Sequence, residues 1–520
     1  MKLTSLLLAA LPIAFAAMPA AAAVATPRKP NILFIAVDDL RPELGCYGKD
    51  YIKSPNIDRI AQSGMVFNRA YCQQAVCSPT RSSLMTGTRP DTTKVWDLVT
   101  HFRAALPDVV TLGQHFKQHG YFVQGMGKIY HGGFDDPATW SVPWQNPRAV
   151  PYALPENLAL NQSKVAGEPD GTPVARKSKN KGKKAAGVKP SGDAIAGEVK
   201  AVRHNTRGPA YECADVPDNT YTDGQVAELA VKTLREIGHH PEPFFLAVGF
   251  VKPHLPFVSP KKYWDLYDPS KIKLAPNPFR PKGAPEYAIL PGGELRTYHG
   301  IPEGHVPDDL ARKLKHGYYA AISYTDAQIG KVVDELSRLG LRQNTIIILW
   351  GDHGWKLGEH DAWCKHSTVE NDVNAPLLLS VPGMKNAGAH SDALVEFVDI
   401  YPTLSELAGL PLPGHLEGAS FKPLLDDPKR PWKSAAFSQY PRSQNGGLMG
   451  YSMRTDRYRF TVWVGRADHS KVDATELYDH QNDPQENTNL AQDPASAELV
   501  QRLMSQWQKS WQGARPPPAK

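Results

Sequence analysis

The stretch that decides the fold is Asn31–Val37, which reads NILFIAV and is followed at once by Asp38 and Asp39. Its apolar residues are continuous rather than alternating, which is typical of a strand buried on both faces of a sheet. Stretches of the same character occur at residues 121–126, 243–250, 345–350 and 376–381. Helical periodicity separates them at residues 110–119 and 309–340, and the second stretch has room for more than one helix. The pattern predicts an α/β domain with a central, mostly parallel sheet flanked by helices.

Charged and imidazole side chains follow several of these strands at the point where each strand ends. The pairs are Asp38 with Asp39, Lys128 with His131, Lys252 with His254, and Asp352 with His353. In open α/β sheets, ligands bind at the carboxyl edge of the strands. Any one pair would fit an ordinary surface loop, but all of them at a common edge indicate a functional site.

The chain changes character from about Trp432 onward. Residues 449–460 and 461–464 have the pattern of antiparallel strands, and residues 476–489 read as a polar turn region. A closing amphipathic helix is predicted at residues 496–511. We therefore predict a catalytic domain at residues 26–430 and a smaller α+β subdomain with an antiparallel sheet at residues 431–520.

The net charge of +6 on 520 residues at first suggests a polyanionic partner such as nucleic acid. Seven of the positive residues, however, lie in residues 176–189, which read RKSKNKGKKAAGVK and contain no acidic residue. Removing these charges leaves −1, so the rest of the chain has no basic excess that would indicate nucleic-acid binding. This segment has almost no apolar surface to bury, and we expect residues 162–202 to form a solvated basic insertion. A tether to an acidic polymer is the alternative.

Residues 1–25 have the features of a secretory signal peptide, with a positive start, an apolar stretch at residues 6–17 and small residues up to Ala25. A membrane anchor is the alternative. Pro12 and Pro19 interrupt this segment, which is already short for a span of about 20 residues. No later apolar run is long enough to form a transmembrane segment. We expect a protein exported to the periplasm or secreted, or a lysosomal one if its source is an animal.

The cysteine count is odd, which leaves at least one thiol unpaired in an exported protein. The cysteines are Cys46, Cys72, Cys77, Cys213 and Cys364. Cys77 opens the segment CSPTR, in which Pro79 suits the first turn of a helix. Cys77 then lies at a helix N-terminus, where anions are favoured, and Arg81 adds a positive charge one turn on. Such a cysteine is a reactive thiol, an anion-site residue, or a buried inert thiol.

The longer segment CSPTRSSLMTG resembles the signature of the sulfatase family, in which the cysteine is oxidised to formylglycine. Other segments resemble metal and active-site segments of that family, namely NILFIAVDDL, WGDHG, GKIYHGG, FVKPHLPF and GEHDAWCKHS. Within the family, DDLRPELGCYG, QQAVCSPTR, GTRPDTT and GYSMRT resemble the iduronate-2-sulfatase type. The resemblance implies an alkaline-phosphatase-like fold and the activity of a sulfuric ester hydrolase.

The resemblance also implies a metal site and a modified nucleophile. The metal ligands would be Asp38, Asp39, Asp352, His353 and an oxygen of the modified Cys77. Carboxylate oxygens suit Ca²⁺ or Mg²⁺ better than zinc, although the imidazole is less usual for a hard cation. A formylglycine-generating enzyme would be a partner during maturation.

In the implied reaction, the aldehyde made from Cys77 hydrates, and one hydroxyl attacks sulfur and releases the sugar alcohol. The other hydroxyl is then deprotonated and expels sulfate, which regenerates the aldehyde. The fixed cations for the sulfate and diol oxygens would be Arg81, Lys128 and Lys365. His131 would be the base, and His254 would be the acid that protonates the leaving oxygen. Many sulfatases place one residue between this lysine and this histidine, whereas two intervene here, a spacing that the uronate-2-sulfatase subfamily shares.

The substrate that the resemblance implies is a sulfated oligo- or polysaccharide with a 2-O-sulfate on a uronic acid. Candidates for binding its carboxylate are Trp96, His101, Arg103 and Lys356, each of which is also compatible with an ordinary packing role. Two other functions stay open. One is phosphodiester or phosphonate hydrolysis within the same superfamily, and the other is non-catalytic binding of acidic glycans.

Overall fold

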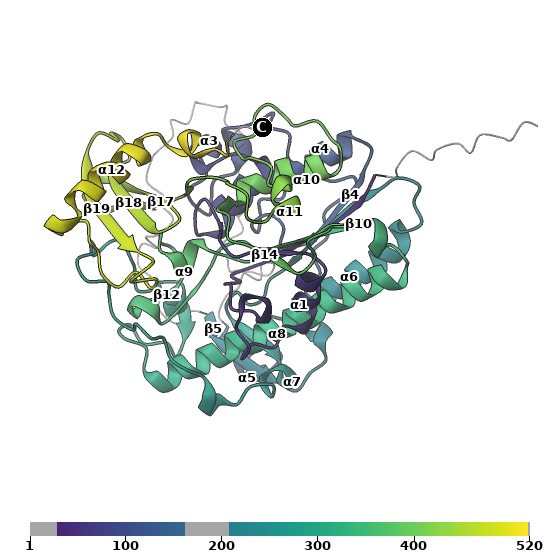
Figure 1. The fold of residues 1–520 in the computed structure, drawn as a ribbon. Coiled ribbons are helices and arrows are strands. Elements are labelled where there is room, and N and C mark those ends of the chain that lie inside the picture. Colours follow the sequence, from purple (N-terminus) through teal and green to yellow (C-terminus); the bar gives the residue numbers. More distant parts are fainter. Residues whose placement is uncertain (1–28, 162–206, 518–520) are drawn as a thin grey trace, which may run out of the picture.

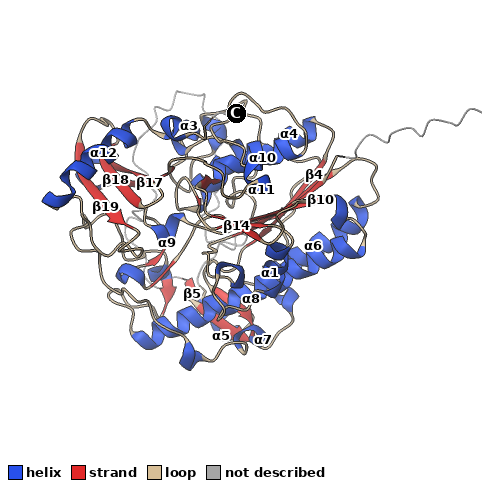
Figure 2. Cartoon of the chain, viewed as in Figure 1, coloured by secondary structure: helices blue, strands red, loops and turns tan. Residues whose placement is uncertain are grey.

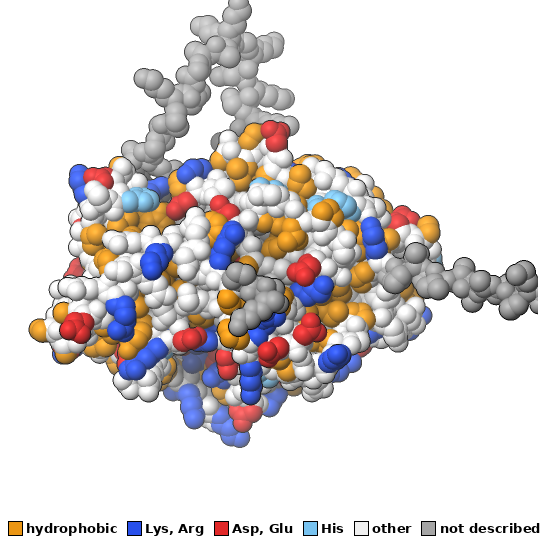
Figure 3. All heavy atoms as spheres, turned by 45° about the horizontal axis from the view of Figure 1, so that its top comes forward, with side chains coloured by type: hydrophobic (Ala, Val, Ile, Leu, Met, Phe, Trp, Pro, Cys, Tyr) orange, Lys and Arg blue, Asp and Glu red, His pale blue; other side chains and the backbone are white. Residues whose placement is uncertain are grey.

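The computed structural model describes residues 29–161 and 207–517 (Figure 1). The predictions for residues 1–25 and 162–202 therefore lie outside the described residues. Within the described ranges, no helix combines the length and the apolar character needed to cross a membrane. All the cysteines are free thiols. Over the face shown in Figure 3, basic and acidic side chains are interspersed.

The central sheet has seven strands in the order β14-β2-β13-β10-β1-β7-β4. Four neighbours run parallel: β10 (Thr345–Gly351), β1 (Asn31–Val37), β7 (Phe244–Phe250) and β4 (Phe122–Gly127). The order continues with β13 (Leu377–Ser380) and β2 (Met65–Phe67), each antiparallel to the strand before it, and β14 (Ala389–Ser391), parallel to β2. The predicted mostly parallel sheet is confirmed, and the antiparallel part begins at β13.

Helices cover both faces of this sheet, as Figure 2 shows. Leu33, Ile35 and Val37 of β1 pack in one buried cluster with α1 (Pro55–Gln62), α6 (Thr222–Ile237) and α8 (Asp308–Arg338). The alternate residues Ile32, Phe34 and Ala36 pack in a second cluster with α2 (Cys77–Thr86), α4 (Leu112–Gln118) and α10 (Ile400–Leu407). The continuous apolar run of β1 therefore results from burial on both faces.

The long predicted helical stretch forms one helix of 31 residues, α8, and not two. Gly317 lies inside it without breaking it. A Cβ at this position would come within 2.9 Å of Phe257 and of Trp264, so the glycine allows close packing.

The C-terminal subdomain has an antiparallel four-stranded sheet, drawn in green-yellow to yellow in Figure 1. Its strands are β16 (Ala436–Arg442), β17 (Leu448–Arg454), β18 (Tyr458–Gly465) and β19 (Val472–Asp479), and α12 (Ala497–Gln508) packs on it. The prediction of a turn at residues 476–478 is wrong, because they end β19. Glu476 is buried there and accepts hydrogen bonds from Trp463 and Tyr478, which removes the cost of burying a polar residue in a strand.

Shorter elements complete the chain. The helices are α3 (Pro90–Thr93), α5 (Pro155–Leu160), α7 (Lys261–Trp264), α9 (Glu370–Val373) and α11 (Lys422–Asp426). The strands are β3 (Ala70–Tyr71), β5 (Arg207–Pro209), β6 (Tyr211–Ala214), β8 (Phe257–Pro260), β9 (Tyr298–His299), β11 (Lys356–Leu357), β12 (Trp363–Cys364) and β15 (Val395–Glu396).

Candidate active site

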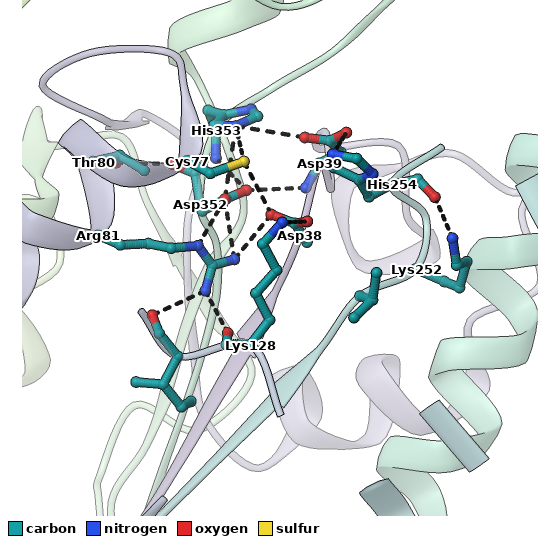
Figure 4. Close-up of polar contacts among 12 residues, drawn as sticks. Asp38, Asp39, Cys77, Thr80, Arg81, Lys128, Lys252, His254, Asp352 and His353 are labelled. Carbon is teal, nitrogen blue, oxygen red and sulfur yellow. Dashed lines mark hydrogen bonds and ion pairs between the residues drawn. The ribbon is translucent and has the colours of Figure 1, made fainter. Parts of the chain in front are cut away.

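The acidic core of the site lies at the carboxyl ends of β1 and β10. Because these strands are parallel neighbours with Val37 opposite Gly351, the residues that follow them meet. The backbone N–H of Asp39 donates to Asp352 Oδ1 at 2.9 Å, and that of His353 donates to the same oxygen at 3.0 Å. These bonds hold buried carboxylates side by side (Figure 4).

Cys77 is the first residue of α2, as the proline in its segment predicted. Its thiol donates to Asp38 Oδ1 at 3.4 Å, and Sγ lies 3.5 Å from His353 Nε2. Thr80 Oγ1 donates to the carbonyl of Asp352 at 2.9 Å and fixes this first turn against the end of β10. The side chain is only 2% exposed, and burial raises the pKa of the Cys77 thiol well above its usual range. An activated thiolate is therefore not what this environment favours.

Arg81 lies one turn further along α2 with its guanidinium fully buried. Its Nε donates to Asp352 Oδ2 and its Nη2 to Asp38 Oδ1, both at 3.0 Å. Its Nη1 donates to the carbonyls of Lys128 and Ile129. One arginine thus connects the ends of β1, β4 and β10, and its planar fork fixes both carboxylates.

Two lysines complete the charge pattern. Lys128 Nζ lies 2.7 Å from Asp38 Oδ2, and Lys365 Nζ lies 3.1 and 3.2 Å from the two Asp39 oxygens. Burial alone would raise the pKa of the Asp38 carboxyl, but Lys128, His254 and Arg81 hold it well below its usual range. Burial raises the pKa of Asp39, although Lys365 opposes that effect.

His254 is held in a buried loop after β7. Its Nδ1 lies 2.6 Å from the carbonyl oxygen of Leu255, so this nitrogen is the donor there. Its Nε2 lies 3.2 Å from Glu294 Oε1 and 3.8 Å from Asp39 Oδ2. Lys252 Nζ donates to the carbonyls of His254 and Pro256 at 2.5 and 2.8 Å and braces the loop.

His131 is buried and stacks on Phe134 with ring centroids 6.0 Å apart. Together with Lys128 it lines a cavity of about 230 Å³, whose walls also include Trp144 and Asn146. The structure thus places the predicted base, His131, in the wall of a cavity that the predicted cation Lys128 also lines.

Glu294 is a site residue that sequence reasoning missed. Besides His254, it contacts Lys365 Nζ at 2.8 Å through its other oxygen. Burial opposes its ionisation, but Lys365 and His254 hold the pKa of this carboxyl well below its usual range. It lies in an irregular loop after two glycines, where neither strand nor helix periodicity gives a signal.

The predicted substrate-binding residues separate into two groups. Trp96 is half-buried, and the ring of His101 lies tilted against Phe134 with centroids 5.9 Å apart; Phe134 also contacts His131. Arg103 instead donates to both oxygens of Asp136 at 3.1 and 2.8 Å. Lys356 is fully buried in an ion pair with Asp372. In the fold Arg103 is therefore paired with Asp136 and Lys356 with Asp372, and their role in binding substrate stays a prediction.

The donor set fits a hard divalent cation. Ligand atoms of Asp38, Asp39, Cys77 and His254 all lie within 4.8 Å of one another, and so do those of Cys77, Asp352 and His353. Three buried carboxylates and few imidazoles match the oxygen preference of Ca²⁺ and Mg²⁺. An oxygen in place of the Cys77 sulfur would strengthen that match.

Comparisons with known proteins identify the family of this chain. Residues 30–410 match the family described as Sulfatase, and residues 358–512 match N-sulphoglucosamine sulphohydrolase, C-terminal. Iduronate 2-sulfatase of Homo sapiens is 34% identical, with 91% of this chain and 93% of the relative covered.

Solved structures share the fold. A protein in complex with its substrate D-glucosamine-2-N,6-O-disulfate has a TM-score of 0.70 at 20% identity, covering 94% of this chain and 98% of its own. A phosphonate monoester hydrolase from Silicibacter pomeroyi has a TM-score of 0.69 at 22% identity, covering 94% and 96%.

Proposed function

This chain belongs to the sulfatase family and is a sulfuric ester hydrolase, and we propose that it removes the 2-O-sulfate of a uronic acid from a sulfated glycan. The observation that carries the chemistry is the position of Cys77 at the start of α2, within 3.5 Å of Asp38 and His353. The likeness to iduronate 2-sulfatase over 91% of the chain supports the choice of sugar and sulfate position.

We propose that Asp38, Asp39, Asp352 and His353 hold a divalent cation, with Ca²⁺ as the first candidate. A bound cation of this kind would neutralise sulfate charge and orient the ester. The chain's own cations oppose the same charge. Lys128 and Lys365 both act on the Cys77 thiol, where they favour the negative form against burial. Fixed positive charges around residue 77 are the arrangement needed by an anionic ester and by the charge that develops during its transfer.

His254 is the proposed acid. With Nδ1 donating to the Leu255 carbonyl, a proton on Nε2 lies between Glu294 and Asp39, beside the residues around Cys77. From there it would be transferred to the leaving sugar oxygen. His131 is the proposed base at residue 77, on the cavity wall that it shares with Lys128.

The maturation proposal follows from burial. The thiol of Cys77 is 2% exposed, so an oxidising enzyme has almost no access to it in the folded chain. We propose that a formylglycine-generating enzyme acts on the segment before folding, and that the chain is exported as its N-terminal residues suggest.

The test is product analysis on defined sulfated disaccharides that differ only in the position of one sulfate. We expect release from the 2-O position of a uronic acid and little from 6-O or N-sulfated sugars; the reverse preference would overturn the proposed substrate. A phosphodiester assayed in parallel tests the remaining alternative, and we expect the sulfate ester to be turned over faster.

A further inference from the structure

Outside the catalytic centre, two cations converge on one indole ring. Lys94 Nζ lies 5.6 Å from the ring centroid of Trp96, and the guanidinium carbon of Arg466 lies 5.2 Å from the same centroid. Lys94 directly follows α3 in the catalytic domain, whereas Arg466 follows β18 of the C-terminal subdomain. We call these three residues the Trp96 cluster. It spans the two parts of the molecule, as the positions of α3 and β18 in Figure 1 show.

The cations of the Trp96 cluster differ from those around Cys77. Among the described residues, neither Lys94 nor Arg466 forms an ion pair with a carboxylate, whereas Lys128 and Lys365 both do. Lys94 is exposed and Arg466 is half-buried. Two cations without a carboxylate partner beside one indole ring favour an anion there electrostatically.

The nearby carboxylate of Asp91 does not fill this role. Its Oδ1 accepts from Trp96 Nε1 at 3.1 Å and from Gln439 Nε2 at 2.9 Å, and its Oδ2 accepts from the Tyr451 hydroxyl at 2.7 Å. These three donors fix Asp91 at the edge of the indole, which holds the ring rigid.

The Trp96 cluster is also fixed relative to the nucleophile. Gln74 Nε2 donates to the carbonyl of Trp96 at 2.9 Å, and Gln74 is buried three residues before Cys77. The backbone N–H of Gln439 donates to the carbonyl of Gln73 at 2.8 Å. The segment that leads into α2 therefore also supports the indole.

We propose that Lys94, Trp96 and Arg466 form a second anion subsite, which holds a charged group of the saccharide other than the sulfate ester under attack. The inference rests on the proposed function in so far as the substrate is an acidic saccharide. The guanidinium fork of Arg466 matches a carboxylate or a sulfate, and Lys94 adds a second positive charge beside it. The subsite would favour oligosaccharides with several anionic groups over substrates with a single sulfate.

The test compares two substrates in the double variant Lys94→Gln/Arg466→Gln. One is a disaccharide with a 2-O-sulfated uronic acid and one further sulfate, and the other is an aryl sulfate with no second anionic group. We expect KM for the disaccharide to rise about tenfold while its kcat changes less. The fall in kcat/KM should be about fivefold larger for the disaccharide than for the aryl sulfate. Lys385→Gln, which removes one positive charge from an exposed loop after β13, is the control for loss of a surface cation.

Equal losses on both substrates would overturn the proposal, because the cations would then only join the subdomain to the catalytic domain. An unchanged KM for the disaccharide would overturn it as well. Repeating the comparison with a carboxyl-reduced disaccharide and with one lacking the further sulfate identifies the ligand, since the tenfold effect should disappear with one of them. If the tenfold effect persists with both altered disaccharides, the subsite holds neither the carboxylate nor the further sulfate. Product analysis of the same reactions tests the 2-O position separately, so the two proposals fail independently.

Discussion

The centre around Cys77 and the Trp96 cluster use positive charge in opposite ways. At the centre, Arg81, Lys128 and Lys365 are buried and each contacts Asp38, Asp39 or Asp352. In the Trp96 cluster, Lys94 and Arg466 reach solvent and contact an aromatic ring. Buried, paired charges cannot move without a large cost, which suits chemistry, whereas unpaired cations near solvent suit recognition.

The largest expected effect is at the nucleophile. Cys77→Ala removes the group that would become the attacking oxygen, so we expect turnover of any sulfate ester to fall by about 10³-fold or more. Sulfate release measures this, and circular dichroism reports the fold. Cys72→Ala, which truncates another buried cysteine on the same segment, is the control and should retain turnover. Loss of activity in both variants would point to a packing defect.

Metal removal should follow in size. Chelation leaves the carboxylates of Asp38, Asp39 and Asp352 without their proposed cation, so we expect activity to fall at least about 100-fold and Tm to drop by a few degrees. Ca²⁺ or Mg²⁺ should restore both the activity and the Tm. Restoration by Zn²⁺ alone would contradict the assignment to a hard cation.

Glu294 tests whether the centre depends on complete charge pairing. Glu294→Gln removes the negative charge that Lys365 and His254 share, so we expect kcat to fall by about 100-fold with a smaller change in KM. Glu286→Gln, on the same segment but exposed, is the control. A rise in KM alone would mean that Glu294 contacts the substrate instead of positioning these two side chains.

The smallest effect concerns the contact that holds the subdomain. Arg459 of β18 pairs with Glu370 and Glu486, and Arg459 and Arg454 overcome burial to lower the pKa of Glu370 to about 2. Because the pKa of Glu370 is lowered in the fold, its carboxylate stabilises the folded state at pH values above the ordinary carboxyl pKa. This stabilisation is lost as pH falls toward 2. We expect the free energy of unfolding to decrease by about 2 kcal/mol over that range, measured by urea unfolding. A smaller decrease in Glu370→Gln than in the parent protein would support Glu370 as the source of this pH dependence.

Much of the fold could be predicted from local patterns. The continuous apolar run gave the bounds of β1, and polar residues directly after strands gave the sheet edge where Asp38 and Asp352 meet. The proline in the cysteine segment gave the start of α2 at Cys77. These features are local in sequence, because a strand buried on both faces and a first helical turn each impose their own residue pattern.

What could not be predicted depends on distant contacts. Glu294 reaches the centre only because its loop folds beside Lys365, and no periodicity marks it. The ion pairs of Arg103 with Asp136 and of Lys356 with Asp372 could not be predicted either, because they join residues that are distant in sequence. Glu476 is polar and was predicted to lie in a turn, but it lies in β19, where it accepts hydrogen bonds from Trp463 and Tyr478.

The most direct test of the proposed chemistry is the mass of the peptide that contains Cys77, taken from active protein made in a host with a formylglycine-generating enzyme. We predict that its mass is lower than that of the cysteine peptide by the difference between a thiol and an aldehyde, and that activity increases in proportion to this converted fraction. Full sulfatase activity from protein in which residue 77 is entirely unmodified cysteine would contradict the assignment of formylglycine as the nucleophile.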